Sequence, residues 1–423
     1  MAGLDERLDR VHRLIAAIEA RQKELVSVAV RETGFTRREC SMEVDVILRR
    51  LRGFDDMVAT FAPRRPLCGS EQEVALVLPY NGSAWLNVAI ASIYLVGNRV
   101  RVKFASRGSE VSRFTESLYG PVFGGNIRFD YSGGRTFLEH AITDPKIPAI
   151  CLFGTDKYAI NYLDSIKAYQ KKFVFEGPGK DPFIVLPGAD LEAAAQELAF
   201  SKYLYAGQTC TAPERVYLHE SVHDDFLERF MNYSRAVRVG DPEDPETEMG
   251  PVASTRAIAA IRAQLEDAVA RGGRIALGGR IEGNLVYPTV VVNASQDMLG
   301  MREETFGPVS FISSFTTLEE VIRLAGDNGY GLRAAIYGEN TEAQGLAEEL
   351  VGEAYCHPVS EMTFGIFGTV AVNQPRSESW EGAFVDKPVG GYGYSGWVWE
   401  TVDGEFILKQ GAKLLSLETS TED

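Results

Sequence analysis

The chain has 423 residues, of which 45% are hydrophobic, 10% aromatic and 24% charged, which is the composition of a globular enzyme rather than of a disordered or fibrous protein. A single hydrophobic core rarely organises so long a chain, so we expect two or three packed domains. The net charge of −16 argues against a nucleic-acid partner, because such proteins need a basic face to neutralise phosphates.

The sequence carries no signal for export, membrane insertion or metal binding. The most apolar stretch, around Val88 to Val96, is shorter than the roughly 20 residues that span a bilayer. The amphipathic N-terminus shows no secretion pattern. The five cysteines are scattered without CxxC pairs, which predicts free thiols and no structural metal. We therefore expect a cytoplasmic protein that binds neither a membrane nor a metal.

Helical periodicity dominates the chain up to about Met57, and the breaker-rich residues 62–66 follow. Beyond them, short apolar runs alternate with amphipathic segments. The expected strands are residues 74–78, 98–104, 149–153 and 173–176, and the expected helices are residues 109–119 and 157–170. This alternation is typical of a parallel sheet covered on both faces, so it predicts a doubly wound domain.

A second alternating series begins at residue 183. Its expected strands are residues 183–186, 215–219, 290–292 and 311–315, with a helix after Val222. This series predicts a second α/β domain. The sequence has no internal repeat or low-complexity tract, which argues against a solenoid.

Cys210 lies in a small polar loop, Tyr205-Ala206-Gly207-Gln208-Thr209-Cys210-Thr211-Ala212-Pro213. A lone cysteine is more often an inert buried residue than a nucleophile. Glu176, however, precedes it by 34 residues and stands where an expected strand ends in a turn rich in Gly and Pro. Such strand ends are where parallel sheets place functional groups. Alone, Glu176 is an ordinary surface carboxylate, but the loops at 78–82 and 303–308 count against that interpretation.

These four motifs, in this order, resemble the aldehyde dehydrogenase superfamily, and the resemblance runs from about Glu73 to Leu417. It implies an α/β fold with a Rossmann-type cofactor domain, an α/β catalytic domain and a small oligomerisation arm. We expect residues 1–177 to form N-terminal helices and the dinucleotide-binding domain, with a short β-arm near 64–75. Residues 178–395 then form the catalytic domain, and residues 396–423 return to the cofactor domain and the arm.

The resemblance implies the catalytic roles. Cys210 matches the nucleophile, Glu176 the general base and Asn81 a donor of the oxyanion hole, while Glu400 matches a carboxylate that relays protons, with a surface role as the alternative. The implied reaction is the NAD(P)-dependent oxidation of an aldehyde to a carboxylic acid. It passes through a cysteine thiohemiacetal and a thioester that activated water hydrolyses.

Residues that match cofactor positions of the superfamily are Pro79, Tyr80, Lys103, Ser106, Arg107, Gly154, Thr155, Glu304 and Phe306. Ser106 stands where NAD-preferring relatives commonly carry glutamate, which would repel a 2′-phosphate. Serine removes that repulsion, and Lys103 and Arg107 offer positive charge. We therefore expect NAD or NADP as cofactor, with NADP use favoured. The alternative is a solvated Arg107 and a preference for NAD.

The expected substrate residues are Tyr80, Thr209, Thr211 and Arg376. Arg376 and Trp380 favour an anionic or aromatic aldehyde, although an ordinary surface loop is the alternative. Ala159 and Pro178 depart from the superfamily pattern, which commonly has glycine at both positions. Only residues 64–75 or so are available for the oligomerisation arm, whereas residues 413–417 could supply a strand for assembly. We therefore expect a homodimer.

Two other functions stay open. On the same fold, the thioester can pass to coenzyme A or phosphate instead of water, in acylation or in the reverse reduction. Glu176 counts against this alternative, because such enzymes need no carboxylate base there. A non-catalytic binding protein that retains the fold is the second alternative. It would be expected to lack Cys210, Glu176 or Asn81, and the sequence has all three.

Overall fold

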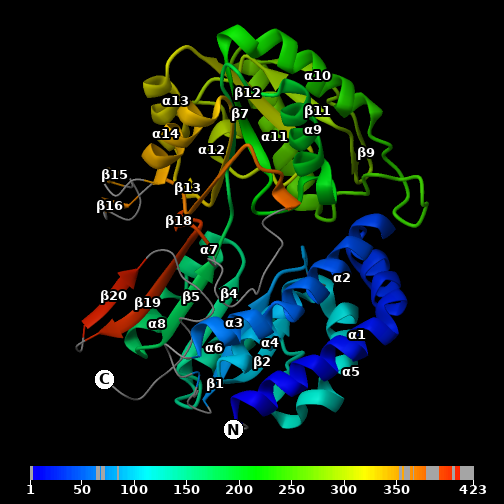
Figure 1. Cartoon of the computed structure of the whole chain (residues 1–423), viewed down its shortest axis with the longest axis vertical. Coiled ribbons are helices and arrows are strands. Elements are labelled where there is room, and N and C mark those ends of the chain that lie inside the picture. Colours follow the sequence, from blue (N-terminus) through cyan, green and yellow to red (C-terminus); the bar gives the residue numbers. More distant parts are fainter. Residues whose placement is uncertain are drawn as a thin grey trace.

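The computed structural model describes residues 3–62, 67, 72–82, 85–351, 355–356, 363–364, 366–377, 390–402 and 405–409. The described residues form two lobes, one above the other, and each lobe is built on a β-sheet flanked by helices (Figure 1). We call the sheet of the lower lobe sheet A and that of the upper lobe sheet B. Among the described helices, none is long and apolar enough to span a bilayer.

Three helices precede the first strand: α1 (Leu4–Thr33), α2 (Arg37–Arg52) and α3 (Phe54–Phe61). The first ends at Gly34, whose φ of 78° is the left-handed conformation that glycine adopts without steric cost. The second begins with a capping box, in which the side chain of Thr36 accepts from the backbone of Glu39 and the side chain of Glu39 accepts from the backbone of Thr36. The buried faces of α1 and α2 pack into one apolar core with sheet A.

Sheet A contains a run of parallel strands. Its described strands are β1 (Glu73–Leu78), β2 (Arg99–Phe104), β3 (Ile127–Phe129), β4 (Ala149–Phe153), β5 (Lys172–Glu176), β19 (Gly396–Val402) and β20 (Glu405–Lys409), in the order β20-β19-β5-β4-β1-β2-β3. The strands β1 to β5 pair in parallel, whereas β19 runs antiparallel to β5, and β20 antiparallel to β19. The helices that connect them are α4 (Val88–Leu95), α5 (Ser109–Phe123), α6 (Gly134–Thr143), α7 (Asp156–Ile160) and α8 (Leu163–Ala168).

Alternate residues of each central strand of sheet A are buried on opposite faces. In β1, Val74 and Leu76 join the core that contains α1, α2, α4 and α5, whereas Ala75 joins the core that contains α6 and α8. Parallel strands that are covered on both faces have continuous runs of apolar residues in their sequence. That explains why the strands were recognisable in the sequence.

Sheet B is built in the same way. Its described strands are β6 (Asp181–Val185), β7 (Pro213–His219), β8 (Arg274–Leu277), β11 (Thr289–Val292), β12 (Val309–Phe315), β14 (Arg333–Tyr337) and β17 (Thr369–Val372), in the order β17-β14-β6-β7-β12-β11-β8. Only β8 is antiparallel to its described neighbour. The helices are α9 (Leu191–Tyr203), α10 (His223–Ala236), α11 (Thr255–Ala270), α12 (Leu299–Arg302), α13 (Leu318–Gly326) and α14 (Asn340–Val351). Short strand pairs are β9 (Ile281–Glu282) with β10 (Leu285–Val286), β13 (Tyr330–Gly331) with β18 (Tyr392–Gly393), and β15 (Tyr355–Cys356) with β16 (Thr363–Phe364).

The expected strands are confirmed in both sheets, with ends that shift by one or two residues. The prediction of one helix over 157–170 is wrong, because the chain forms α7 and α8 with a break at Asn161 and Tyr162. Asparagine competes for backbone hydrogen bonds and favours such breaks. The expected β-arm near 64–75 is wrong at its end, since residues 73–75 belong to β1 inside sheet A. Residues 64–66, 68–71, 413–417 and Trp380 lie outside the described residues.

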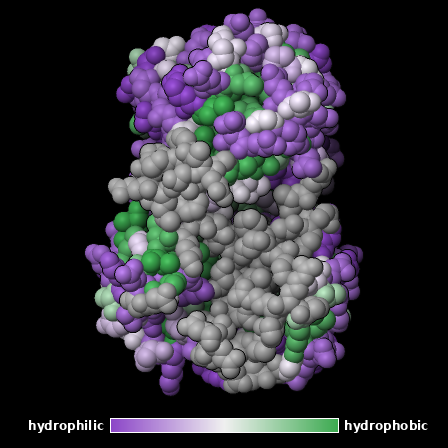
Figure 2. Space-filling view, turned by 60° about the vertical axis from the view of Figure 1, so that its left-hand side comes forward, coloured by the Kyte–Doolittle hydropathy of each residue, from purple (hydrophilic) through white to green (hydrophobic). Residues whose placement is uncertain are grey.

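The chain passes from sheet A to sheet B directly after Glu176 and returns through β19, whose Gly396 pairs with Glu176. Among the residues that Figure 2 colours, hydrophilic surface covers much of the upper lobe, and patches of apolar surface lie in both lobes. The crossing places the end of β5 between the two lobes.

Candidate active site

A cavity of about 1490 Å³ lies between the lobes. Its walls come from loops at the ends of β1, β2, β4 and β5 in sheet A, from the loop before β7 in sheet B and from residues 303–306. Clefts outside the carboxyl ends of parallel strands are the usual ligand sites of such sheets. The residues expected from the sequence that line this cavity are Pro79, Tyr80, Asn81, Lys103, Ser106, Gly154, Thr155, Glu176, Thr209, Cys210, Thr211, Glu304, Phe306 and Arg376.

Cys210 and Glu176 meet in this cavity, although 34 residues separate them. Glu176 is the last residue of β5, Cys210 lies in the loop before β7, and both side chains line the cavity, close enough for each to shift the pKa of the other. Burial raises the pKa of Glu176 to about 7, and the nearby Cys210 thiol partly opposes that rise. Burial, and then the negative charge of Glu176, raise the pKa of the Cys210 thiol well above its usual value. Both side chains keep some exposure, because they face the cavity.

The backbone around Cys210 is tightly held. Ala212 N donates to Thr209 O at 3.1 Å, which closes a turn with Cys210 inside it. The preceding Gly207 has a φ of 72°, and a β-carbon there would overlap the backbone of Gly307. The side chain of Gln208 donates to Tyr205 O at 2.9 Å and accepts from Ala253 N at 2.8 Å. The thiol is therefore carried by a loop with a defined conformation.

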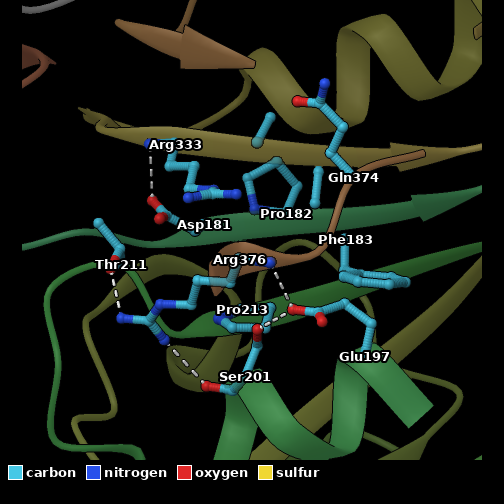
Figure 3. Close-up of a pocket in the computed structure, with 12 residues that line it drawn as sticks. Asp181, Pro182, Phe183, Glu197, Ser201, Thr211, Pro213, Arg333, Gln374 and Arg376 are labelled. Atoms are coloured by element: carbon cyan, nitrogen blue, oxygen red, sulfur yellow. Dashed lines mark hydrogen bonds between the residues drawn. The ribbon is translucent and has the colours of Figure 1, made fainter. Parts of the chain in front are cut away.

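Arg376 lines the cavity, but it is only 7% exposed and its guanidinium is hydrogen-bonded to this loop and to α9. Its Nη2 donates to Thr209 Oγ1 at 3.0 Å and to Thr211 Oγ1 at 2.6 Å, and its Nη1 donates to Ser201 O at 3.1 Å. Figure 3 shows the guanidinium between Thr211 and Ser201. Of the four side chains expected to contact substrate, Arg376 thus contacts two others, Thr209 and Thr211.

Tyr80 and Asn81 follow β1. The hydroxyl of Tyr80 donates to Gln208 Oε1 at 3.2 Å, and its ring meets that of Phe306 edge to face with centroids 6.4 Å apart. Pro79 and Asn81 are partly buried and line the cavity beside Tyr80. These residues therefore bring the β1 loop, the Cys210 loop and the Phe306 loop to one place.

A buried ion pair that the sequence analysis missed supports the Phe306 loop. Lys180 Nζ donates to Glu214 Oε2 at 2.6 Å, and Glu214 accepts from the backbone N–H groups of Thr305 and Phe306 at 2.8 and 2.9 Å. Although burial alone would raise the pKa of Glu214, the charges of Lys180 and Lys202 hold it below the usual value. Charged residues inside buried strands were the available signal in the sequence.

Glu304 belongs to the same support. Its Oε1 accepts from Gly179 N at 3.2 Å, next to the turn that follows Glu176. Burial, and then the charge of Glu214, raise the pKa of Glu304 well above its usual value. The Glu304 side chain therefore connects the loop of residues 303–306 to the turn that follows β5.

Lys103 and Ser106 line the sheet A side of the cavity at the end of β2. The ammonium of Lys103 donates to Phe104 O at 3.3 Å, and burial lowers its pKa while the charge of Asp130 opposes that shift. Ser106 is exposed, as is Arg107, but Arg107 donates to the carbonyl of Ala253 and is absent from the lining. The expected phosphate contact from Arg107 thus conflicts with its hydrogen bond to Ala253.

Gly154 and Thr155 line the cavity between β4 and α7. Gly154 N donates to Glu176 O at 3.0 Å, and Thr155 is the exposed N-cap residue of α7. The lining also includes Tyr158, Arg256 and Arg333, which the sequence analysis did not single out. Tyr158 lies within the segment from Gly154 to Ala159, whereas Arg256 and Arg333 come from segments without a recognisable motif, so only the packing of the lobes identifies them.

The structure does not bring Glu400 to this site. Glu400 lies on β19, four residues beyond the Gly396 that pairs with Glu176, which places it about 13 Å away along the strand. Its carboxylate forms an ion pair of 3.3 Å with Lys172 instead. Among the described residues, no group of three or more His, Cys, Asp or Glu side chains could hold a metal.

Solved structures share this fold. The succinic semialdehyde dehydrogenase of Streptococcus pyogenes, solved in complex with NADP+, matches with a TM-score of 0.83 at 24% identity, over 99% of this chain and 89% of that chain. The betaine aldehyde dehydrogenase of Staphylococcus aureus, solved with NAD+, matches with a TM-score of 0.81 at 23% identity, over 96% of this chain and 82% of that chain.

The chain belongs to the aldehyde dehydrogenase family, whose model matches residues 2–404. Similar characterised proteins include a D-glyceraldehyde dehydrogenase (NADP+) of Picrophilus torridus, 25% identical over 89% of this chain and 78% of that protein. A succinate semialdehyde dehydrogenase [NAD(P)+] of Escherichia coli is 28% identical over 86% of this chain and 83% of that protein. A vanillin dehydrogenase of Pseudomonas fluorescens is 29% identical over 84% of this chain and 77% of that protein.

Proposed function

We propose that this protein is an NAD(P)-dependent aldehyde dehydrogenase that uses Cys210 as nucleophile, Glu176 as general base and Asn81 as oxyanion donor. The observation that carries the proposal is that the Cys210 thiol and the Glu176 carboxylate line the same cavity between the lobes, close enough to shift each other's pKa. The carboxylate thus lies beside the sulfur on which the thioester forms, where it can take a proton from the attacking water. Family membership supports the oxidation of an aldehyde.

The proposed reaction begins when the Cys210 thiol loses its proton to water in the cavity and the sulfur forms a bond to the aldehyde carbon. The oxygen becomes an oxyanion that the Asn81 amide stabilises, and loss of such a donor typically costs about 10²–10³ in rate. The carbon–hydrogen bond then breaks with its electron pair, and a thioester on Cys210 remains. Glu176 takes a proton from water, the hydroxide adds to the thioester carbon, and the carbon–sulfur bond breaks to release the acid.

The residues on the sheet A side, together with Phe306 from the loop before β12, fit a dinucleotide. They supply the Lys103 ammonium, the exposed hydroxyls of Ser106 and Thr155, and the aromatic rings of Tyr80 and Phe306. NAD(P)+, when bound, supplies the acceptor for the hydride. We propose that Lys103 and Ser106 hold the adenosine ribose, and that Glu304 and Phe306 hold the nicotinamide end. The exposed Ser106 carries no charge that repels a 2′-phosphate, which supports the use of NADP.

The contact of Glu176 with Cys210 favours water as the acyl acceptor over coenzyme A or phosphate. The test is an aldehyde panel that includes D-glyceraldehyde, succinate semialdehyde and vanillin, followed at the absorbance of reduced nicotinamide with each cofactor. Cys210→Ala is the control. We expect stoichiometric acid and reduced cofactor without added coenzyme A. Formation of product only when coenzyme A or phosphate is present would overturn the hydrolytic assignment.

We also propose that the protein is a homodimer in the cytoplasm. Supporting features lie at the edge of sheet A, where β20 is the outermost described strand. In the β19–β20 hairpin, Trp399 and Phe406 stack at 5.1 Å, and Val402 is 37% exposed. An open edge strand with apolar neighbours is a surface that a second copy can cover. Light scattering at micromolar concentration tests it, and a monomer would contradict the proposed assembly.

A further inference from the structure

The two threonines that flank Cys210 share one hydrogen-bond donor. Nη2 of Arg376 lies 3.0 Å from Thr209 Oγ1 and 2.6 Å from Thr211 Oγ1. A guanidinium presents its N–H donors in a fixed planar fork, so it constrains both acceptors at once. Any change in the spacing of the two hydroxyls breaks at least one of these hydrogen bonds. The conformation of the residue between them, Cys210, is coupled to that spacing.

Arg376 itself is anchored on the upper lobe. Its Nη1 donates to the carbonyl of Ser201 in α9 at 3.1 Å, and its backbone N–H donates to the Glu197 carboxylate at 3.1 Å. The residue is 7% exposed. The neighbouring cavity, shown in Figure 3, measures only about 20 Å³, which is room for roughly one water molecule. The side chain therefore has little space in which to move, and α9 serves as a fixed support for the nucleophile loop.

The positive charge of Arg376 counteracts the carboxylates that raise the pKa of the Cys210 thiol. After burial, the groups that raise the pKa of the Cys210 thiol are the carboxylates of Glu176, Glu304 and Asp181. Burial and the neighbouring Arg333 lower the pKa of Arg376, whereas an ionised Cys210 raises it. That last effect is mutual, so the guanidinium favours the thiolate form of Cys210. An arginine stays protonated in proteins, so this charge is permanent.

We propose that Arg376 is a positioning residue for the nucleophile, which fixes Cys210 through Thr209 and Thr211 and holds a permanent positive charge beside the reactive sulfur. The inference deepens the proposed function and rests on the assignment of Cys210 as nucleophile. It replaces the expectation that Arg376 contacts substrate. It also gives Thr209 and Thr211 a role in aligning the thiol.

The test measures the rate at which iodoacetamide alkylates Cys210, from about pH 7 to about pH 11.5, because only the thiolate reacts and the pKa of this thiol is raised well above its usual value. The alkylated peptide is quantified by mass spectrometry, with Cys210→Ala as the blank. Neither aldehyde nor cofactor is present, so the result is readable even if the proposed oxidation fails. In Arg376→Gln, we expect the midpoint of the pH profile to rise by about one pH unit or more, since a neighbouring opposite charge shifts a pKa by about 1–3 units. An unchanged midpoint would overturn the role of the charge.

Arg376→Lys keeps the charge but cannot bridge both threonines. We expect its midpoint to stay near that of the wild type while alkylation slows at every pH. This variant also decides the case in which Arg376→Gln does not fold, because a midpoint that rises in Arg376→Lys would contradict the proposal.

Substitutions of the two threonines test the alignment of Cys210 separately from the effect of the Arg376 charge. In Thr209→Val with Thr211→Val, the acceptors are lost and the guanidinium remains, so we expect alkylation and aldehyde turnover to fall severalfold without a shift of the midpoint. The matched control, Thr209→Ser with Thr211→Ser, keeps both hydroxyls and should behave like the wild type. Equal rates in the valine and serine variants would exclude the positioning role.

Discussion

The α-carbon of Gly179 packs directly against the carbonyl of Cys210, so closely that a β-carbon on Gly179 would overlap that oxygen. The turn after Glu176 therefore lies against the loop that carries Cys210, with no room for a side chain between them. The close approach explains why glycine is required at this position, whatever its φ. It also brings the turn that follows Glu176 against the backbone of Cys210.

Gly179→Ala should therefore displace the nucleophile loop. Overpacking of this kind typically costs about 1–3 kcal/mol of stability. We expect a lower melting temperature and a fall in kcat/KM of about tenfold or more, which corresponds to about 1.4 kcal/mol. Gly345→Ala is the control, because a β-carbon at this helical position in α14 meets nothing within 4 Å. Equal activity in the two variants would mean that the close approach has no effect on the nucleophile.

Cys210→Ala and Glu176→Gln should fail at different steps. We expect Cys210→Ala to lose both oxidation and covalent labelling by aldehyde, since no sulfur remains to form the bond. Glu176→Gln should give a first-turnover burst of reduced cofactor and then stall as thioester, because water lacks its base. Stopped-flow absorbance and intact mass measure the two outcomes. Full steady-state turnover by Glu176→Gln would remove Glu176 from the mechanism.

Turnover should depend on pH through Glu176. Its pKa is raised to about 7, so the carboxylate that serves as base is populated above this pH and lost below it. Where hydrolysis limits the rate, we expect kcat to fall by about tenfold for each pH unit below about 6. Hydroxylamine, which attacks the thioester without that base, should restore turnover at low pH. A kcat that stays constant down to about pH 5 would show that Glu176 is not the limiting base.

The cofactor preference should respond to Ser106. Because Ser106 is exposed in the cavity beside Lys103, we expect Ser106→Glu to repel a 2′-phosphate and lower kcat/KM for NADP by roughly tenfold or more. Arg107→Gln is the matched comparison, since Arg107 donates to the Ala253 carbonyl outside the lining, and its ratio of NADP to NAD efficiency should change little. A Ser106→Glu variant with the wild-type ratio would show that this position does not distinguish the cofactors.

Stability should also depend on pH through a carboxyl in the N-terminal helices. Glu43 is fully buried, both its oxygens lack a hydrogen-bond partner, and burial followed by the charge of Glu39 raises its pKa well above 4.5. A raised folded-state pKa means that its stabilising effect is present below about 4.5 and is lost as the pH rises through the folded-state value. Glu43→Gln stays neutral, so we expect its melting temperature to exceed that of the wild type increasingly between about pH 5 and about pH 8.

The control for that measurement is Glu348→Gln, on the exposed face of α14. It should follow the wild type across the whole range, because an exposed carboxylate stays solvated in both states. A constant difference between Glu43→Gln and the wild type at every pH would contradict the argument.

Local patterns in the sequence were enough to predict the strands that build the two sheets. Each central strand is buried on both faces, so its apolar run is visible in consecutive residues such as those of β1 and β4. The loops that carry Asn81, Glu176 and Cys210 were also recognisable, because they follow or precede those strands. Helix breaks such as the one at Asn161 were missed, since the competition of an asparagine side chain for backbone hydrogen bonds leaves no mark in the period of the apolar residues.

The tertiary structure alone decided which side chains meet. Arg376 reaches Thr209 and Thr211 across more than 160 residues, Arg107 reaches the Ala253 carbonyl, and Glu400 pairs with Lys172 away from Glu176. A motif records only the neighbours of a residue along the chain. The direction of a long charged side chain is set by burial and by hydrogen-bond partners from other strands and loops, and these exist only after the two sheets have packed together.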